Sequence, residues 1–125
     1  MANPNIVNVA AIYGNSLQTS LTTTSATSLV SNAASSGKVY KINSITVANV
    51  DGTNAADITI NVYSQAALGG TAFPIVSTVS VPADATLIVT DKTTSFYLLE
   101  NQSIGATAGT ASDLVVNASW EEINS

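Results

Sequence analysis

The chain has 125 residues, a formal net charge of −5, and no cysteine, histidine or arginine. Without these side chains it has no thiol or imidazole for catalysis or metal binding, and it cannot form a disulfide. Three lysines against eight acidic residues argue against binding to nucleic acid or to an anionic membrane, because both depend on basic side chains.

The length favours a single domain, residues 1–125, with one hydrophobic core. Charged residues make up only 9% of the chain, so serine, threonine and asparagine must supply most of the polar surface. Such a surface suits either a subunit packed against neighbours or a soluble module. No apolar run approaches the roughly 18 to 20 residues of a membrane span. Residues 1–5 lack the features of a secretory signal, so we expect the protein to be made in the cytoplasm and to stay on that side of the membrane unless lysis or a dedicated machine releases it.

The first predicted element covers residues 5–13, which are rich in apolar side chains. Two interpretations stay open. The segment is either an ordinary first strand, or part of an N-terminal arm, residues 1–14, that pairs with a neighbouring subunit's sheet edge. The second interpretation predicts a subunit interface made by Ile6, Val9, Ile12 and Tyr13.

Residues 17–37 are of low complexity and rich in serine and threonine. A disordered linker is one interpretation of such a tract. However, Leu17 and Leu21 are an even number of residues apart, so they would lie on the same face of a strand, and threonine favours strands. We therefore favour two modest strands over a linker.

The later segments show clearer strand patterns. In residues 57–64, Ile58, Ile60 and Val62 alternate with polar or aromatic residues, as in a strand with one buried face. Further strands are predicted at residues 39–50, 73–81, 86–91 and 95–99, and from residue 114 onward. Turns are predicted at residues 51–54, 68–71, 82–84, 100–102 and 108–110. This spacing predicts an all-β fold, an antiparallel β-sandwich of jelly-roll or immunoglobulin-like type with about eight strands and at most one helical turn.

No group of residues predicts catalysis, a cofactor or a metal site. The carboxylates lie beside turns or at strand ends, which favours solvated turn residues over an acid–base pair. Asp51, Asn54 and Asp57 supply too few oxygens at too wide a spacing for a calcium loop. Trp120 shares a strand face with Leu114 and Val116, which favours a core or interface anchor over a sugar-stacking residue. We therefore expect no enzyme.

Several stretches of the chain resemble small virion structural proteins of tailed bacteriophages, with those of cyanophages most similar. They are MANPNIVNV (1–9), VYKINSITVANVDG (39–52), ADITINVY (56–63), VSVPADATL (79–87), FYLL (96–99) and SWEEI (119–123). The chain departs from the family at residues 100–102, which read Glu-Asn-Gln where the family often has an acidic residue, Gly and Asp.

The resemblance implies a β-sandwich present in many copies on a particle. It implies a capsid decoration or cement protein whose partners are the major capsid protein or other virion proteins, and copies of itself, as a homotrimer. Many weak contacts would add up through multivalency on such a lattice. The alternative is a tail, fibre or adhesin-type module that recognises a host glycan, which the single tryptophan and four tyrosines suggest.

Overall fold

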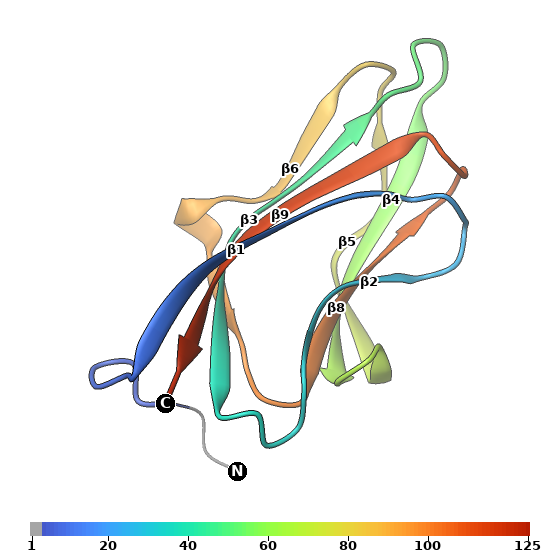
Figure 1. The fold of residues 1–125 in the computed structure, drawn as a ribbon. Coiled ribbons are helices and arrows are strands. Elements are labelled where there is room, and N and C mark those ends of the chain that lie inside the picture. The colour runs from blue at the N-terminus through green and yellow to red at the C-terminus, as the bar shows by residue number, and fades with distance from the viewer. Residues whose placement is uncertain (1–3) are drawn as a thin grey trace.

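A computed structural model describes residues 4–125, which form nine strands and one short 3₁₀ turn, η1 (Figure 1). The strands are β1 (Ala11–Ser20), β2 (Thr27–Asn32), β3 (Lys38–Asn49), β4 (Ala56–Gln65), β5 (Gly69–Val81), β6 (Thr86–Thr90), β7 (Phe96–Leu98), β8 (Gln102–Ala108) and β9 (Leu114–Asn124). The turn η1 covers Lys92–Thr94, between β6 and β7.

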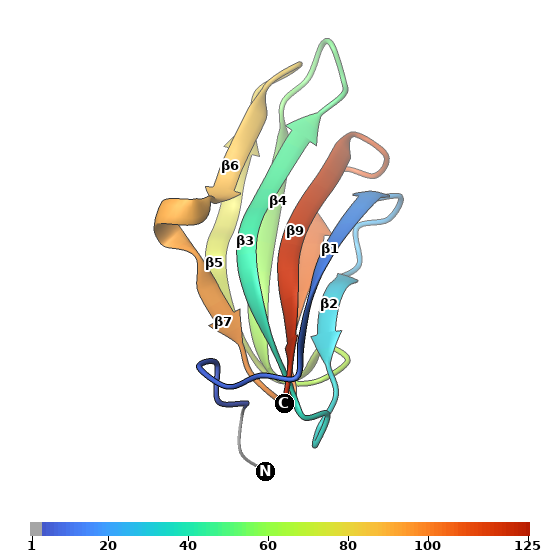
Figure 2. The same ribbon diagram turned by 60° about the vertical axis from the view of Figure 1, so that its left-hand side comes forward.

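The strands form two antiparallel sheets packed face to face. Sheet A has the order β1-β9-β3-β6, with β7 also paired to β3, and sheet B has the order β2-β8-β4-β5. Figure 2 shows sheet A in front, with β6, β3, β9 and β1 side by side, and sheet B behind it. Strands from the first half of the chain pair with strands from the second half in nested order, which is the jelly-roll connectivity. The predicted all-β sandwich is therefore confirmed.

One apolar core lies between the sheets. Its largest fully buried side chains come from both sheets: Ile42, Ile45, Val47, Leu114 and Val116 from sheet A, and Ile58, Ile60 and Ile104 from sheet B. Each such side chain contributes about 1.5–3 kcal/mol by leaving water. The alternation along residues 57–64 is confirmed, because Ile58 and Ile60 are fully buried while Asp57 is exposed.

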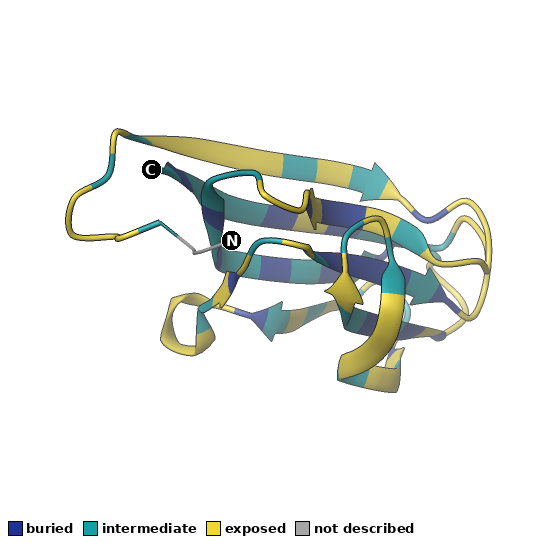
Figure 3. Ribbon diagram, turned by 90° about the horizontal axis from the view of Figure 1, so that it is seen from below, coloured by how far each residue is buried: buried dark blue, intermediate teal, exposed yellow. Residues whose placement is uncertain are grey.

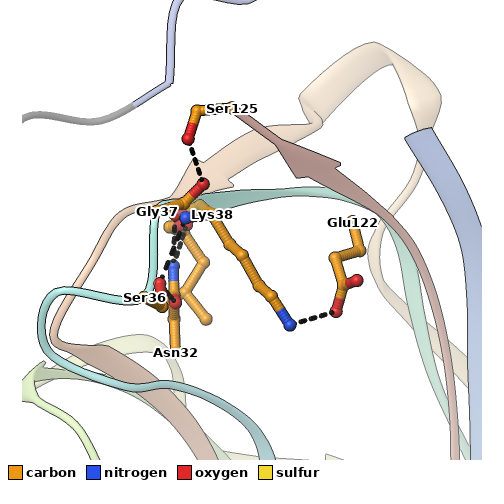
Figure 4. A network of polar contacts seen from close by, with 7 residues as sticks. Asn32, Ser36, Gly37, Lys38, Glu122 and Ser125 are labelled. Carbon is orange, nitrogen blue, oxygen red and sulfur yellow. Dashed lines mark hydrogen bonds and ion pairs between the residues drawn. The ribbon is translucent and has the colours of Figure 1, made fainter. Parts of the chain in front are cut away.

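Two buried asparagines join the sheets by hydrogen bonds. The amide of Asn32, in β2, donates to the carbonyl oxygens of Lys38 at 2.9 Å and Leu98 at 3.4 Å, both in sheet A (Figure 4). The amide of Asn49, in β3, donates to Asn54 O at 2.9 Å and to Val81 O, in sheet B, at 3.0 Å. These bonds satisfy polar groups that would otherwise be costly to bury.

The turn between β4 and β5 folds back over the outer face of sheet B. Three successive backbone N–H groups, of Ala66, Ala67 and Leu68, donate to side-chain oxygens of Asn101, Ser31 and Ser103 at 3.1, 2.9 and 2.8 Å. Ala67 and Leu68 have φ of 57° and 60°, a conformation that non-glycine residues adopt only at a cost. The hydrogen bonds therefore hold a strained turn against β2 and β8.

The structure differs from the sequence-based prediction at β8, at the first strand, and at the turn predicted over residues 68–71, of which residues 69–71 belong to β5. β8, a central strand of sheet B, was not predicted, because its sequence QSIGATA has mostly small side chains and little alternation. The first strand begins at Ala11 and continues to Ser20, so residues 5–10 lie outside it. Of the two strands expected within residues 17–37, only β2 lies entirely there; residues 17–20 are the end of β1, and residues 21–26 separate it from β2.

Candidate assembly surface

The first strand, β1, forms one edge of sheet A. All ten of its residues pair with β9 without a register shift. Its sequence, AIYGNSLQTS, has no charged residue and no proline. β1 is largely exposed along its length, as the long yellow strand in Figure 3 shows.

The free edge of β1 presents an alternating row of backbone groups. The N–H of Leu21, just after the strand, donates to Leu114 O at 2.9 Å, in the same register as the β1–β9 pairs. In an antiparallel strand, the N–H and C=O of alternate residues point to the same side. Odd-numbered residues of β1 therefore bond to β9, and the even-numbered residues from Ile12 to Ser20 direct their N–H and C=O groups away from the sheet.

The outer face of sheet A, the face turned away from the core, is nearly neutral around its centre. Cross-strand rows there read Gln18–Asn117–Thr46–Ile88 and Ser16–Ser119–Ser44. The charged side chains of the next row, Glu121 and Lys41, lie directly opposite each other. This face therefore offers hydroxyl and amide groups with little net charge.

The end of the same face that is lowest in Figure 2, near the start of β1 and the end of β9, is apolar. The register places Ile12, Ile123 and Val39 in one row, and Ile123 and Val39 are buried although they lie outside the main core cluster. Residues 4–10 cross this end of sheet A in Figure 2, on the side away from sheet B. The N-terminal segment therefore lies over the sheet to which β1 belongs.

The four residues predicted to form an interface do not share one surface. Ile6 is half exposed, within a turn in which the Asn8 N–H donates to Asn5 O. Val9 is half-buried. Ile12 and Tyr13 are both exposed, but they are successive residues of β1 and so point to opposite faces of sheet A. Tyr13 is paired with Glu122, whereas Ile12 is paired with Ile123.

A polar group lies where the lower ends of the two sheets meet. Lys38 Nζ and Glu122 Oε1 are 3.4 Å apart and partly exposed (Figure 4). Burial raises the pKa of the Tyr40 hydroxyl above its ordinary value of 10.0, and the Glu122 carboxylate acts in the same direction. Such a part-exposed ion pair adds little stability, but it places both signs of charge at this end.

The other residues weighed from the sequence have local roles. The Asp51 carboxylate accepts hydrogen bonds from the N–H groups of Thr53 and Asn54 at 2.8 and 3.2 Å, so it shapes the β3–β4 turn. Trp120 is half-buried and packs against the core cluster. Within residues 4–125 there is no detected cavity and no cluster of acidic, histidine or cysteine side chains that could hold a metal ion. No helix in that range is long and apolar enough to cross a membrane.

No protein-family model and no curated protein match the chain. The structure is similar to a solved chain of Bacillus endospore appendages, which are described as a novel family of disulfide-linked pili. The TM-score is 0.53 at 18% sequence identity, and the match covers 92% of this chain and 87% of the other. At this identity the likeness concerns the fold alone. The chain is thus similar in fold to an appendage protein, but it has no cysteine with which to form the disulfides that name that family.

Proposed function

We propose that the protein is a non-enzymatic structural subunit of a phage virion that decorates the outside of the capsid. The observation that carries the proposal is the neutral surface formed by β1 and the outer face of sheet A. A surface without strong charge loses little free energy when neighbours desolvate it, and its hydroxyl and amide groups can bond to many partners.

The resemblance of the sequence to phage virion proteins is the reason for proposing a virion as the particle to which the protein binds. Repeated copies on a lattice turn weak individual contacts into firm attachment, because each contact holds its neighbours at high effective concentration. The partners proposed are the major capsid protein and further copies of this chain, arranged as trimers.

Purified virions test the proposal directly. We expect the protein in stoichiometric amounts in particles purified on a density gradient, and a reconstruction of the whole particle should place it on the head. Absence of the protein from purified virions would contradict the proposal.

Add-back of the protein to particles that lack it tests which face binds. Asn117 is exposed at the centre of the outer face of sheet A, and we expect Asn117→Lys to weaken binding by about tenfold or more, through steric and desolvation costs. The control is Ser28→Lys, which adds the same charge to an exposed position of β2 in sheet B. Equal binding by the two variants would exclude the sheet A face as the contact.

A second candidate is a subunit of an extracellular filament, favoured by the fold similarity to an appendage chain. Because this chain has no cysteine, contacts between its own copies would be non-covalent. Electron microscopy of the concentrated protein separates the two candidates, since a filament subunit should form fibres without any particle and a decoration protein should not.

A further inference from the structure

The four edges of the two sheets differ in how they are protected against pairing. Natural edge strands are usually blunted by charge, proline, bulges or short length. β5 contains Pro74 and has three register shifts against β4. β2 has six residues and one register shift, and β6 and β7 have five and three residues, separated by η1 with Lys92.

β1 has none of these devices. It is ten residues long, regular and uncharged, and it pairs with a neighbour on one side only. Its even-numbered residues, Ile12, Gly14, Ser16, Gln18 and Ser20, direct donors and acceptors outward. An edge of this kind is a template for another strand.

We propose that β1 pairs with β1 of a second copy of this chain, antiparallel, about a two-fold axis at Ser16. This register opposes Ser16 to Ser16, Gly14 to Gln18 and Ile12 to Ser20, so every outward N–H meets an outward C=O. The five outward residues of each strand would make about ten hydrogen bonds. Two sheets A would become one continuous sheet.

Charge does not oppose a second copy at this edge. In the proposed register the row Lys41–Glu121–Gly14 continues into Gln18 and Asn117 of the second copy, so no carboxylate faces a carboxylate although the chain carries a net charge of −5. The other three edges of a second copy are bulged, short or interrupted, and so they cannot match ten regular residues. Among the four sheet edges of this chain, the free edge of β1 is therefore the one that best matches the free edge of β1 in a second copy.

This pairing rests on the proposed function in one respect: it would be one of the contacts between subunits on the capsid. Trimers on a lattice are related to their neighbours by local two-fold axes, and β1–β1 pairing would link one trimer to the next.

A single introduced cysteine tests the pairing, because the chain has none of its own. Residues opposed in a hydrogen-bonded pair have Cα atoms about 5.5 Å apart, within the range of a disulfide. Under mild oxidation we expect most of Ser16→Cys to form disulfide-linked dimers. Ser44→Cys, on the outer face of the same sheet but two strands inward, should remain monomeric. Cross-linking of Ser16→Cys no faster than Ser44→Cys would overturn the proposal.

Opposed charges test the register independently. Ser16→Lys and Ser16→Glu should each weaken self-association by roughly fivefold, because like charges lie directly opposite each other at the axis. A mixture of the two should recover a heterodimer stronger than either homodimer. No preference for the mixed pair would refute pairing at Ser16. A protein that fails both tests but occurs in virions loses only this contact, whereas one that passes both but is absent from virions loses the proposed role.

Discussion

Sheet B is completed by its own chain, whereas sheet A is left open. On sheet B, the β4–β5 turn covers part of the outer face, Leu68 lies against Gly105, and the edge strand β5 contains proline and bulges. On sheet A, the centre of the outer face is uncovered and β1 ends the sheet with a regular edge. A chain that covers part of one outer face and protects both edges of that sheet, but leaves one edge and the centre of the other sheet uncovered, has a preferred side for contacts. Substitutions on sheet B should therefore affect folding, and matched substitutions on sheet A should affect assembly.

The largest difference is expected between two serines. Ser103 Oγ is buried, accepts from the Leu68 N–H and donates to Gln65 O, both at 2.8 Å. Ser103→Ala leaves both backbone groups without this partner, and we expect a loss of about 2–4 kcal/mol in the free energy of unfolding. Ser119→Ala, on the outer face of sheet A, should change it by less than about 0.5 kcal/mol. Urea unfolding measures both, and similar losses would remove the contrast between the sheets.

Two glycines give a smaller contrast of the same kind. A Cβ at Gly105 would lie 2.8 Å from Leu68 Cδ2 and 3.1 Å from Tyr63 Cε2, whereas a Cβ at Gly14 would meet nothing within 4 Å. We expect Gly105→Ala to cost about 1–2 kcal/mol, because Leu68 must move away from sheet B. Gly14→Ala should be neutral or stabilise by up to about 1 kcal/mol, through the lower entropy of the unfolded chain. Thermal unfolding of the two variants checks the order.

The smallest expected effect is on the pH dependence of stability, and it arises in two turns that follow strands of sheet A. Hydrogen bonds from the Thr53 and Asn54 N–H groups hold the pKa of Asp51 below its ordinary 3.8, and bonds from the Thr93 hydroxyl and N–H do the same for the pKa of Asp91. This stabilisation is present above pH 3.8 and is lost as the pH falls through the lower folded values. The double variant Asp51→Asn, Asp91→Asn should flatten the slope of stability between about pH 5 and 2.5. An unchanged slope would show that other carboxylates set it.

The sequence was sufficient for the sandwich because most strands alternate, as Ile58 and Ile60 do, or end at strong turns such as residues 51–54. It was not sufficient for β8, because Gly105 and its small neighbours have little intrinsic preference for a strand. Gly105 fits there because the side chains of Leu68 and Tyr63 pack against it. The fold-back of the β4–β5 turn was equally hidden, because it depends on Ser31 and Ser103, which lie far away in the sequence.

The candidate surface was predictable only in part. Apolar residues near the N-terminus indicated contacts, but the alternation of a strand separates Ile12 from Tyr13, and the exposed edge continues to Ser20. Which backbone groups point outward depends on the register with β9, whose paired residues lie 95 to 113 positions later in the chain, and a local pattern carries no information about it. The absence of charge and proline from residues 11–20 was visible from the start, but its meaning needed the other three edges for comparison.

The blunted edges limit how many copies can join into one sheet, as the number of reactive ends limits the growth of a polymer. A monomer with two reactive ends grows into a chain, whereas a monomer with one reactive end couples once and stops. With the edges at β5, at β2 and at β6–β7 protected, this subunit has one sheet edge, that of β1, that can act as a reactive end. Pairing through β1 would consume it on both copies and could not propagate into a fibre. The same edge that would link neighbours thus also limits the growth of the sheet.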